Sequence, residues 1–154
     1  MSDPIREAKV GNLGQLLLRA ARLYNERSVE MLQQIVPELT VAHTSLFPHL
    51  DLDGTRSSVL AKRLGISKQA VGQLVNDLEK MGMLARTQDP ADGRARLVVF
   101  TEKGRASIVE GLAVLKKVER EAAESVGEES IECLKSELER LLGFLEPDSE
   151  GACG

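Results

Sequence analysis

Residues 60–84, LAKRLGISKQAVGQLVNDLEKMGML, constrain the fold of this 154-residue chain more strongly than any other segment. Apolar residues recur at helical spacing on both sides of Gly65, a residue type that ends helices readily. Ser67, just after the break, is a good N-cap residue for a new helix. The pattern therefore predicts a short helix over residues 57–64, a tight turn, and a second helix over residues 67–81.

The second predicted helix has a polar face with few of the charged side chains that a solvated helix normally carries. Its members are Ser67, Lys68, Gln69, Gly72, Gln73 and Asn76. A glycine inside a helix costs about 1 kcal/mol relative to Ala, so it often marks a place where another molecule comes close. Gly72 could admit a base edge or a sugar; the alternative is a tolerated glycine without a role.

A hairpin follows the two helices. The segments MLARTQ and RARLVVF are strand-like, and the sequence DPADG between them suits a hairpin loop. Two helices joined by a short turn and followed by a hairpin make a winged helix-turn-helix, whose second helix enters the DNA major groove. Gln and Asn can pair with adenine, Lys with guanine, and Ser with bases or phosphate. We therefore expect the polar face to contact DNA.

The hairpin loop, or wing, supplies a second candidate contact. Arg94 and Arg96 follow the loop, where an arginine could enter the minor groove and respond to its negative potential. Asp92 could hold the guanidinium of Arg94 in position through a carboxylate fork. The alternative is a solvated hairpin with an ion pair that contributes little.

Helical periodicity also predicts helices outside this block. They cover approximately residues 10–35, 41–50, 102–126 and 128–146, and the second of them should be interrupted near Pro48. The predicted fold class is mainly α with a small β-hairpin wing: a winged helix-turn-helix plus a helical dimerisation region.

The predicted helices suggest a division of the chain. We expect a DNA-binding domain over residues 37–101, a helical dimerisation region formed by residues 1–36 and 102–146, and a disordered tail over residues 147–154. Two long amphipathic helices that extend from a small domain leave apolar stripes exposed unless a partner covers them. The expected homodimer contacts are Leu13, Leu134, Leu138, Leu141, Leu142 and Leu145.

Charge is distributed unevenly along the chain. The whole chain has a net charge of −4, which by itself argues weakly against binding to nucleic acid. Residues 55–105, however, contain ten Lys or Arg and only five Asp or Glu, so the acidic excess lies outside the winged block. This asymmetry gives the centre a positive field that suits double-stranded DNA. The alternative is a chance scatter of surface charge.

Other functional classes have little support. No segment resembles a signal peptide or a membrane span, and two cysteines are too few for a disulfide framework, so we expect a cytoplasmic protein. His43 and His49 are six residues apart and would face different sides of a helix, which makes a poor metal pair. DLDG at residues 51–54 lacks the further ligands of a calcium loop. We predict no enzymatic activity, no cofactor and no metal.

With these features the sequence resembles the MarR family of transcriptional regulators. The resemblance covers about residues 10–145, and its specific part is the block LAKRLGISKQAVGQLVNDLEKMGML with the wing DPADGRARLVVFTEKG. It implies a homodimer that binds two half-sites of a pseudo-palindromic operator, typically a repressor released by a small anionic or aromatic ligand or by cysteine oxidation. It adds Ser57 and Arg86 to the expected DNA contacts.

By the same analogy, Leu17, His43 and Phe47 would line a ligand crevice, which would suit an aromatic acid. The oxidation-sensing branch of the family has a reactive cysteine near the start of its first helix, and this chain has none there. Cys133 lies instead in the last predicted helix, where a small buried residue is the favoured interpretation and a redox role is the alternative.

A second function class remains open. The acidic flanks would also suit a helical dimeric interaction module that does not bind DNA. The basic centre and Arg94 in the wing argue against it, and salt-sensitive binding to a duplex would distinguish the two.

Overall fold

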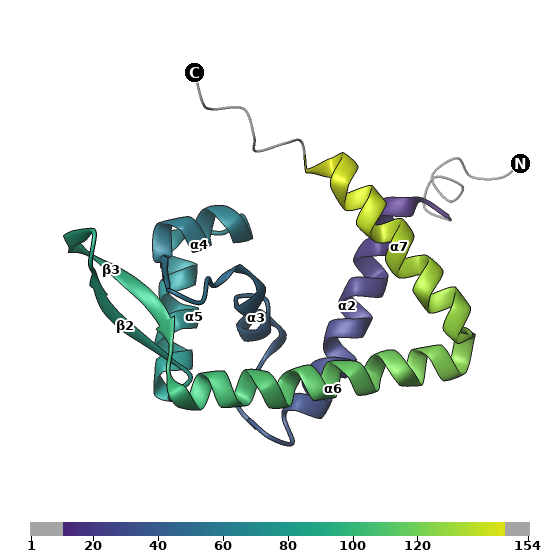
Figure 1. Ribbon diagram of the computed structural model, residues 1–154, viewed down its shortest axis with the longest axis horizontal. Coiled ribbons are helices and arrows are strands. Elements are labelled where there is room, and N and C mark those ends of the chain that lie inside the picture. Colours follow the sequence, from purple (N-terminus) through teal and green to yellow (C-terminus); the bar gives the residue numbers. More distant parts are fainter. Residues whose placement is uncertain (1–10, 147–154) are drawn as a thin grey trace, which may run out of the picture. The chain divides into compact units, whose positions relative to one another are not determined.

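The computed structural model describes residues 11–146 and divides into two compact units that meet between Leu115 and Lys116. Figure 1 shows mainly helices, with one small antiparallel sheet. The predicted fold class is therefore confirmed. The predicted tail over residues 147–154 and the start of the first predicted helix at Val10 lie outside the described residues.

The first unit begins with α2, Leu13–Leu32, whose N-cap Asn12 accepts a hydrogen bond from the backbone N–H of Gln15 at 3.3 Å. The helix is shorter than the predicted range 10–35 at both ends. The helix ends at Leu32, and residues 33–35 form turns ahead of Pro37. The residue before a proline disfavours α geometry, which agrees with this early end.

The helix predicted over residues 41–50, with an interruption near Pro48, is shorter and ends earlier than expected. The segment forms a one-turn helix, α3, Val41–Thr44, and then a 3-10 turn, η1, Phe47–His49. Pro48 has no N–H to continue an α-helical hydrogen-bond ladder, so the helix ends before it. α3 is held by a capping box in which Thr40 and His43 each bond the other's backbone N–H.

The helix-turn-helix agrees closely with the prediction. Helix α4 spans Ser57–Leu64 and α5 spans Lys68–Lys80. Gly65 between them has φ +67°, the left-handed region in which glycine carries no steric cost. Ser67 caps α5 by accepting a hydrogen bond from the backbone N–H of Ala70 at 3.1 Å.

The sheet has one strand more than predicted. Strands β2, Leu84–Asp89, and β3, Asp92–Phe100, form the expected hairpin, and β1, Thr55–Arg56, pairs with the other edge of β3. A strand of two residues is too short to show an alternating pattern, so the sequence did not reveal it. A register shift between Gln88 and Asp89 marks the end of regular pairing toward the wing loop.

A single apolar core joins these elements. Its most fully buried side chains are Leu46, Leu60, Val71, Val75, Leu78 and Val98, from α3–η1, α4, α5 and β3. On α5 the buried face is formed by Val71, Val75 and Leu78, with Leu74 partly buried. Because three side chains anchor one face of α5, its polar face is turned to solvent.

Two long helices complete the chain. Thr101 precedes α6, Glu102–Val126, and its hydroxyl accepts a hydrogen bond from the backbone N–H of Gly104 at 2.9 Å. A Cβ on Gly104 would lie 1.9 Å from the carbonyl oxygen of Met83, so only glycine allows the helix to start this close to β2. Helix α7, Glu128–Leu145, follows a break at Gly127.

Within the second unit, one lysine links the two helices. The Nζ atom of Lys135 on α7 lies 2.9 Å from Glu119 on α6 and 3.1 Å from Glu132. These two carboxylates raise the pKa of Lys135 to about 12. The leucines of α7 are less covered: Leu134, Leu142 and Leu145 are each more than half exposed, while Leu138 and Leu141 are partly buried.

Candidate nucleic-acid interface

The polar face of α5 forms a continuous solvent-facing surface. Lys68, Gln69, Gln73 and Asn76 are exposed, and Gly72 between them is partly exposed. Ser67, at the start of the helix, is exposed as well, but its oxygen already caps the helix. The predicted DNA-contacting residues of this helix thus lie together on one face.

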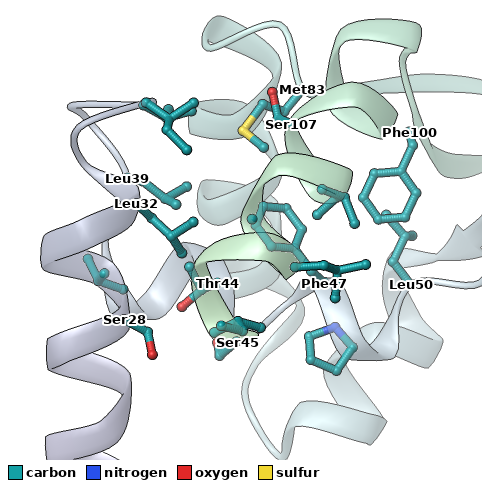
Figure 2. Close-up of a pocket in the computed structure, with 18 of the residues that line it drawn as sticks. Ser28, Leu32, Leu39, Thr44, Ser45, Phe47, Leu50, Met83, Phe100 and Ser107 are labelled. Atoms are coloured by element: carbon teal, nitrogen blue, oxygen red, sulfur yellow. The ribbon is translucent and has the colours of Figure 1, made fainter. Parts of the chain in front are cut away.

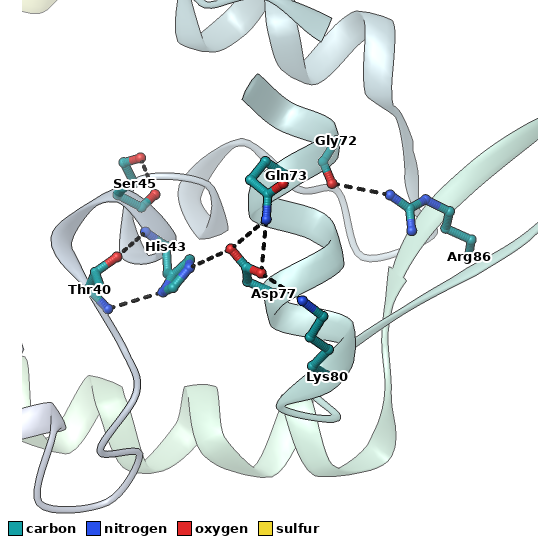
Figure 3. Close-up of polar contacts among 9 residues, drawn as sticks. Thr40, His43, Ser45, Gly72, Gln73, Asp77, Lys80 and Arg86 are labelled. Atoms are coloured by element: carbon teal, nitrogen blue, oxygen red, sulfur yellow. Dashed lines mark hydrogen bonds and ion pairs between the residues drawn. The ribbon is translucent and has the colours of Figure 1, made fainter. Parts of the chain in front are cut away.

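Gln73 does not extend freely from this face. Its Nε2 atom donates to both carboxylate oxygens of Asp77, each at 3.1 Å (Figure 3). Lys80 lies 3.4 Å from the same carboxylate, and His43 on α3 lies 3.8 Å from it. The hydrogen bond from Gln73, followed by the charges of Lys80 and His43, lowers the pKa of Asp77.

Gly72 has no role that the described chain explains. A Cβ built on it would meet no atom within 4 Å, and its φ is not positive. Neither packing nor backbone conformation therefore requires glycine here. Its carbonyl accepts a long hydrogen bond, 3.5 Å, from Arg86 of the wing. The absence of an internal reason favours the interpretation that an external molecule approaches Gly72 closely.

Arg86 is tied to α5 rather than free. Besides its contact with Gly72, it forms an ion pair with Glu79, and both side chains are only about three-tenths exposed. The pair joins β2 to α5, and the carboxylate of Glu79 offsets the positive charge of Arg86. Its main effect in this structure is to hold the wing against α5.

Arg94 and Arg96 project from β3, and both are exposed. Within residues 11–146 neither side chain forms a hydrogen bond or an ion pair, so both guanidinium groups are available to a ligand.

The predicted fork between Asp92 and Arg94 is wrong. Asp92 accepts instead from the backbone N–H of Arg94 at 3.1 Å, closing a turn over two residues. Its other oxygen lies 3.7 Å from Arg56. The carboxylate therefore shapes the loop without holding the arginine side chain.

A strong contact near the loop end of the hairpin was not predicted from the sequence. Arg56 on β1 donates through Nε to Asp89 at 2.7 Å, and its NH2 group lies 2.5 Å from the same oxygen. Asp89 is buried and also accepts from the backbone N–H of Ala91 at 2.8 Å. The Ala91 N–H and then Arg56 lower the pKa of this carboxyl. The two residues are 33 positions apart, and only the unpredicted strand β1 brings them together.

Ser57, which follows Arg56, is partly exposed at the start of α4.

A second feature of the first unit is a cavity of about 700 Å³ (Figure 2). Its walls come from the C-terminal half of α2, the segment 35–52, the ends of the sheet and the first half of α6. Phe47 lines it, as predicted. Leu17 and His43 are not among the lining residues: Leu17 lies further toward the start of α2, and His43 is buried beside Thr40 and Asp77. The crevice is thus centred further along α2 than expected.

The polar side chains of the cavity wall are Asn25, Ser28, Thr44, Ser45, His49 and Ser107, and three of the hydroxyls already donate within the protein. Ser28 donates to the carbonyl of Tyr24 at 2.8 Å, Thr44 to that of Val41 at 2.9 Å, and Ser45 to that of Ala42 at 2.7 Å. Toward the cavity these hydroxyls can offer only lone pairs. Within residues 11–146, no Lys, Arg, Asp or Glu lines the cavity.

Other predictions concern chemistry outside these surfaces. The interpretation of Cys133 as a buried residue is wrong for this chain: the thiol is exposed on α7, beside exposed Leu134. The part of the chain that the structure describes contains no group of His, Cys, Asp or Glu that could hold a metal ion. None of its helices combines the length and the apolarity needed to cross a membrane.

Comparisons with known proteins agree with this architecture. A family model described as "MarR family" matches residues 39–95, from just before α3 into the wing. A probable transcriptional regulator from Pseudomonas aeruginosa is 26% identical and superposes with a TM-score of 0.67 over 85% of this chain and 97% of its own.

Two further relatives are more distant or partial. CouR from Rhodococcus jostii RHA1, solved with p-coumaroyl-CoA, is 22% identical with a TM-score of 0.69 over 92% of this chain and 96% of its own. A structure of the repressor CouR on a 23-mer DNA duplex is 23% identical, with a TM-score of 0.66 over 92% and 99%. The LexA repressor of Deinococcus radiodurans is 34% identical over 110 residues, or 70% of this chain, but the match spans only half of that relative's length.

The family match coincides with the helix-turn-helix and wing, and the structural matches extend the agreement to the long terminal helices. Residues 39–95 therefore match the MarR family, and the chain has the winged helix-turn-helix fold of the solved structures that it resembles.

Proposed function

We propose that this protein is a transcriptional regulator that binds a pseudo-palindromic DNA site as a homodimer. The observation that carries the proposal is the exposed polar face of α5, with Lys68, Gln69 and Asn76 accessible, together with Arg94 and Arg96 of β3, which are exposed and have no partner within residues 11–146. A helix of this kind suits the major groove, and a wing arginine suits the minor groove. The matched family is one of regulators and not of enzymes, and the structurally similar repressor CouR has been solved on a DNA duplex.

The dimer part of the proposal is supported by uncovered apolar surface in both units. In the first unit Leu13, Leu16 and Leu18 of α2 are more than half exposed, and in the second Leu134, Leu142 and Phe144 are. Such stripes are rare on a soluble monomer and are normally covered by a partner. A second copy of the chain is the proposed partner, with an interface on the order of 2,000 Å². The division into a dimerisation region, 1–36 with 102–146, and a DNA-binding domain, 37–101, is part of this proposal.

The experiment is selection of bound duplexes from a random pool, followed by binding measurements at several salt concentrations. We expect an inverted repeat with half-site centres about 10 base pairs apart and an affinity that falls steeply as salt rises. A protein that is dimeric but binds no duplex would be the helical interaction module instead.

Two variants separate the proposed contacts by type. Gln73→Ala should cost roughly 1–3 kcal/mol and relax the preference at one operator position. Arg94→Ala should weaken binding to most sequences and flatten the salt dependence, because a minor-groove arginine responds to charge and shape. Identical changes in specificity for both variants would contradict the assignment of contacts.

We further propose that a small molecule in the 700 Å³ cavity weakens DNA binding, which would make the protein a repressor released by ligand. A ligand shifts the protein away from DNA only if it binds more tightly to a conformation that misfits the operator. By linkage, operator DNA must then weaken ligand binding by the same factor. CouR has been solved with p-coumaroyl-CoA, so a relative of this fold does bind a small molecule.

The cavity wall favours an uncharged ligand over the aromatic acid expected from the sequence. Among the described residues of the wall a carboxylate would find no Lys or Arg, and it would face the lone pairs of Ser28, Thr44 and Ser45. Its hydrogen-bond donors there would be limited to Asn25, His49 and Ser107. Burial of an unpaired charge is costly. A mainly apolar molecule with a hydroxyl donor, such as a phenol or an aromatic alcohol, meets these acceptors instead.

The test uses matched pairs of aromatic alcohols and acids, such as benzyl alcohol and benzoate, in a DNA-release assay and a thermal-shift assay. The alcohol of each pair should act at the lower concentration. Gly111→Leu, which adds a side chain to the cavity wall, should retain DNA binding and lose the ligand response. A stronger effect of the acids would contradict the uncharged-ligand proposal, while DNA binding could still hold.

A further inference from the structure

The side chain of Gln73 is held by an acidic residue one turn further along the same helix. Its Nε2 atom lies 3.1 Å from Oδ1 and 3.1 Å from Oδ2 of Asp77, so the amide nitrogen points between the two oxygens. Figure 3 shows the two side chains directed at each other on the surface of α5. Residues four apart on a helix are neighbours, so this contact needs no distortion of the backbone.

Chemistry fixes which end of the amide faces Asp77. A glutamine amide has a donor end and an acceptor end, and its two orientations have nearly the same shape. An ionised carboxylate can only accept hydrogen bonds. If the amide turned over, Oε1 would face two negatively charged oxygens and the hydrogen bond would be lost. The orientation with Nε2 toward Asp77 is therefore the stable one.

The carboxylate itself is held from two further sides. Lys80 lies 3.4 Å from Oδ1, and the buried His43 on α3 lies 3.8 Å from Oδ2. These groups, with Gln73, favour the ionised form and keep the pKa of Asp77 below its ordinary value. Asp77 is also only about three-tenths exposed, whereas Gln73 is exposed. Asp77 is therefore placed to orient Gln73 rather than to contact a base.

We propose that Asp77 is a specificity-determining positioning residue, which sets the Gln73 amide so that Oε1 is the end available to accept from a base edge. This inference rests on the proposed DNA-binding function. In the major groove only the N6 amino group of adenine and the N4 amino group of cytosine are donors. The operator position that Gln73 contacts is thus adenine or cytosine on the contacted strand. Guanine O6 and thymine O4 are acceptors, and they would face Oε1 without a proton between them.

The experiment compares the base preference of the wild type with those of Asp77→Asn, Asp77→Glu and Gln73→Ala, using the selected operator and all four bases at each position. Gln73→Ala identifies the position that depends on Gln73. There the wild type should prefer adenine or cytosine by about tenfold or more. Asp77→Asn, whose amide can either donate or accept, lets Gln73 adopt both orientations and should reduce that preference to about twofold. Asp77→Glu keeps a carboxylate and should restore part of it.

Controls separate this effect from charge and from folding. Removing an acidic group near DNA should tighten binding to all sequences alike, and Asp53→Asn, in an exposed turn, measures how large such a uniform effect is. A purely structural role of Asp77 would lower the melting temperature and weaken all duplexes equally, without changing the preference at one position. In the double variant Gln73→Ala, Asp77→Asn, the second change should have no further effect on base preference.

The outcomes are distinct. If the wild type binds no duplex, the proposed function fails. If it binds but prefers guanine or thymine at the Gln73-dependent position, or if Asp77→Asn leaves the preference unchanged, the positioning role of Asp77 is overturned and DNA binding stands. The wild-type base preference alone decides the case if the Asp77 variants do not fold.

Discussion

At the scale of single residues, the recognition helix combines positions that serve the fold with positions that do not. Ser67 caps the helix, and Val71 and Val75 anchor it in the core. Gly72 does neither, because a Cβ there would meet no atom within 4 Å. A residue that lowers helix stability without an internal benefit indicates an external constraint, and the groove of a bound duplex would supply one.

Gly72→Ala should therefore separate stability from binding. The variant should be more stable than the wild type by about 0.5–1 kcal/mol, because alanine favours the helix and no neighbour obstructs its methyl group. Its affinity for the selected operator should fall, since the methyl group occupies the space of the approaching DNA. Denaturant unfolding and operator binding measure the two effects. A more stable variant with unchanged affinity would show that Gly72 is merely tolerated.

At the scale of elements, the wing depends on contacts that are distant in sequence. The two-residue strand β1 extends the sheet by pairing with β3 and presents Arg56 to the buried Asp89 at the loop end of β2. Arg86 ties β2 to α5 through Glu79 and Gly72. The exposed Arg94 and Arg96 thus project from a hairpin that is fixed near its loop end and along its side.

The contact between Arg56 and Asp89 should make the stability of the fold sensitive to acid. The pKa of Asp89 lies below its ordinary value of 3.8 in the folded protein, so the ionised carboxylate stabilises the fold above about pH 4. That stabilisation is lost as the pH falls below 4 through the lowered pKa. Asp89→Asn should be less stable than the wild type at neutral pH, and its stability should change less between pH 5 and 3.

Thermal unfolding at a series of pH values measures this difference. Asp53→Asn is the matched control, because the Asp53 side chain has no hydrogen bond or ion pair within residues 11–146. Asp53→Asn should therefore follow the wild-type pH dependence. Parallel pH curves for Asp89→Asn and the wild type would show that the Arg56–Asp89 pair does not contribute.

At the scale of the whole molecule, the proposed regulator requires two copies of the chain. Each unit exposes leucines along its long helices, and a duplex with two half-sites needs two recognition helices in fixed register. Linked binding of two half-sites raises the overall affinity well above that of one winged domain, because the second contact becomes intramolecular.

Leu142→Glu should test this requirement. Placing a charge in the apolar stripe of α7 should give a monomer in sedimentation experiments at micromolar concentration and reduce operator affinity by about 100-fold or more. Val41→Glu, an exposed apolar residue at the start of α3, is the control and should leave the dimer intact. A monomeric wild type, or a dimeric Leu142→Glu that binds normally, would contradict the proposed interface.

The local parts of the structure followed from the sequence. The two helices around Gly65, the cap at Ser67 and the hairpin after Gly82 depend on neighbouring residues, and each agrees with the prediction. The polar face of α5 could also be predicted from the sequence, because the helical repeat places each side chain on a particular face once the start of the helix is known.

Only the tertiary structure decided which of these side chains are free to act. Asp92 was expected to hold Arg94 but closes the loop backbone, while the distant Arg56 is paired with Asp89. His43 was expected in the ligand crevice but is buried against Asp77. These choices depend on contacts between segments that the folded core brings together, and a single sequence contains no local signal for them. The sequence therefore determined the elements and their faces, and packing determined the partners of each charge.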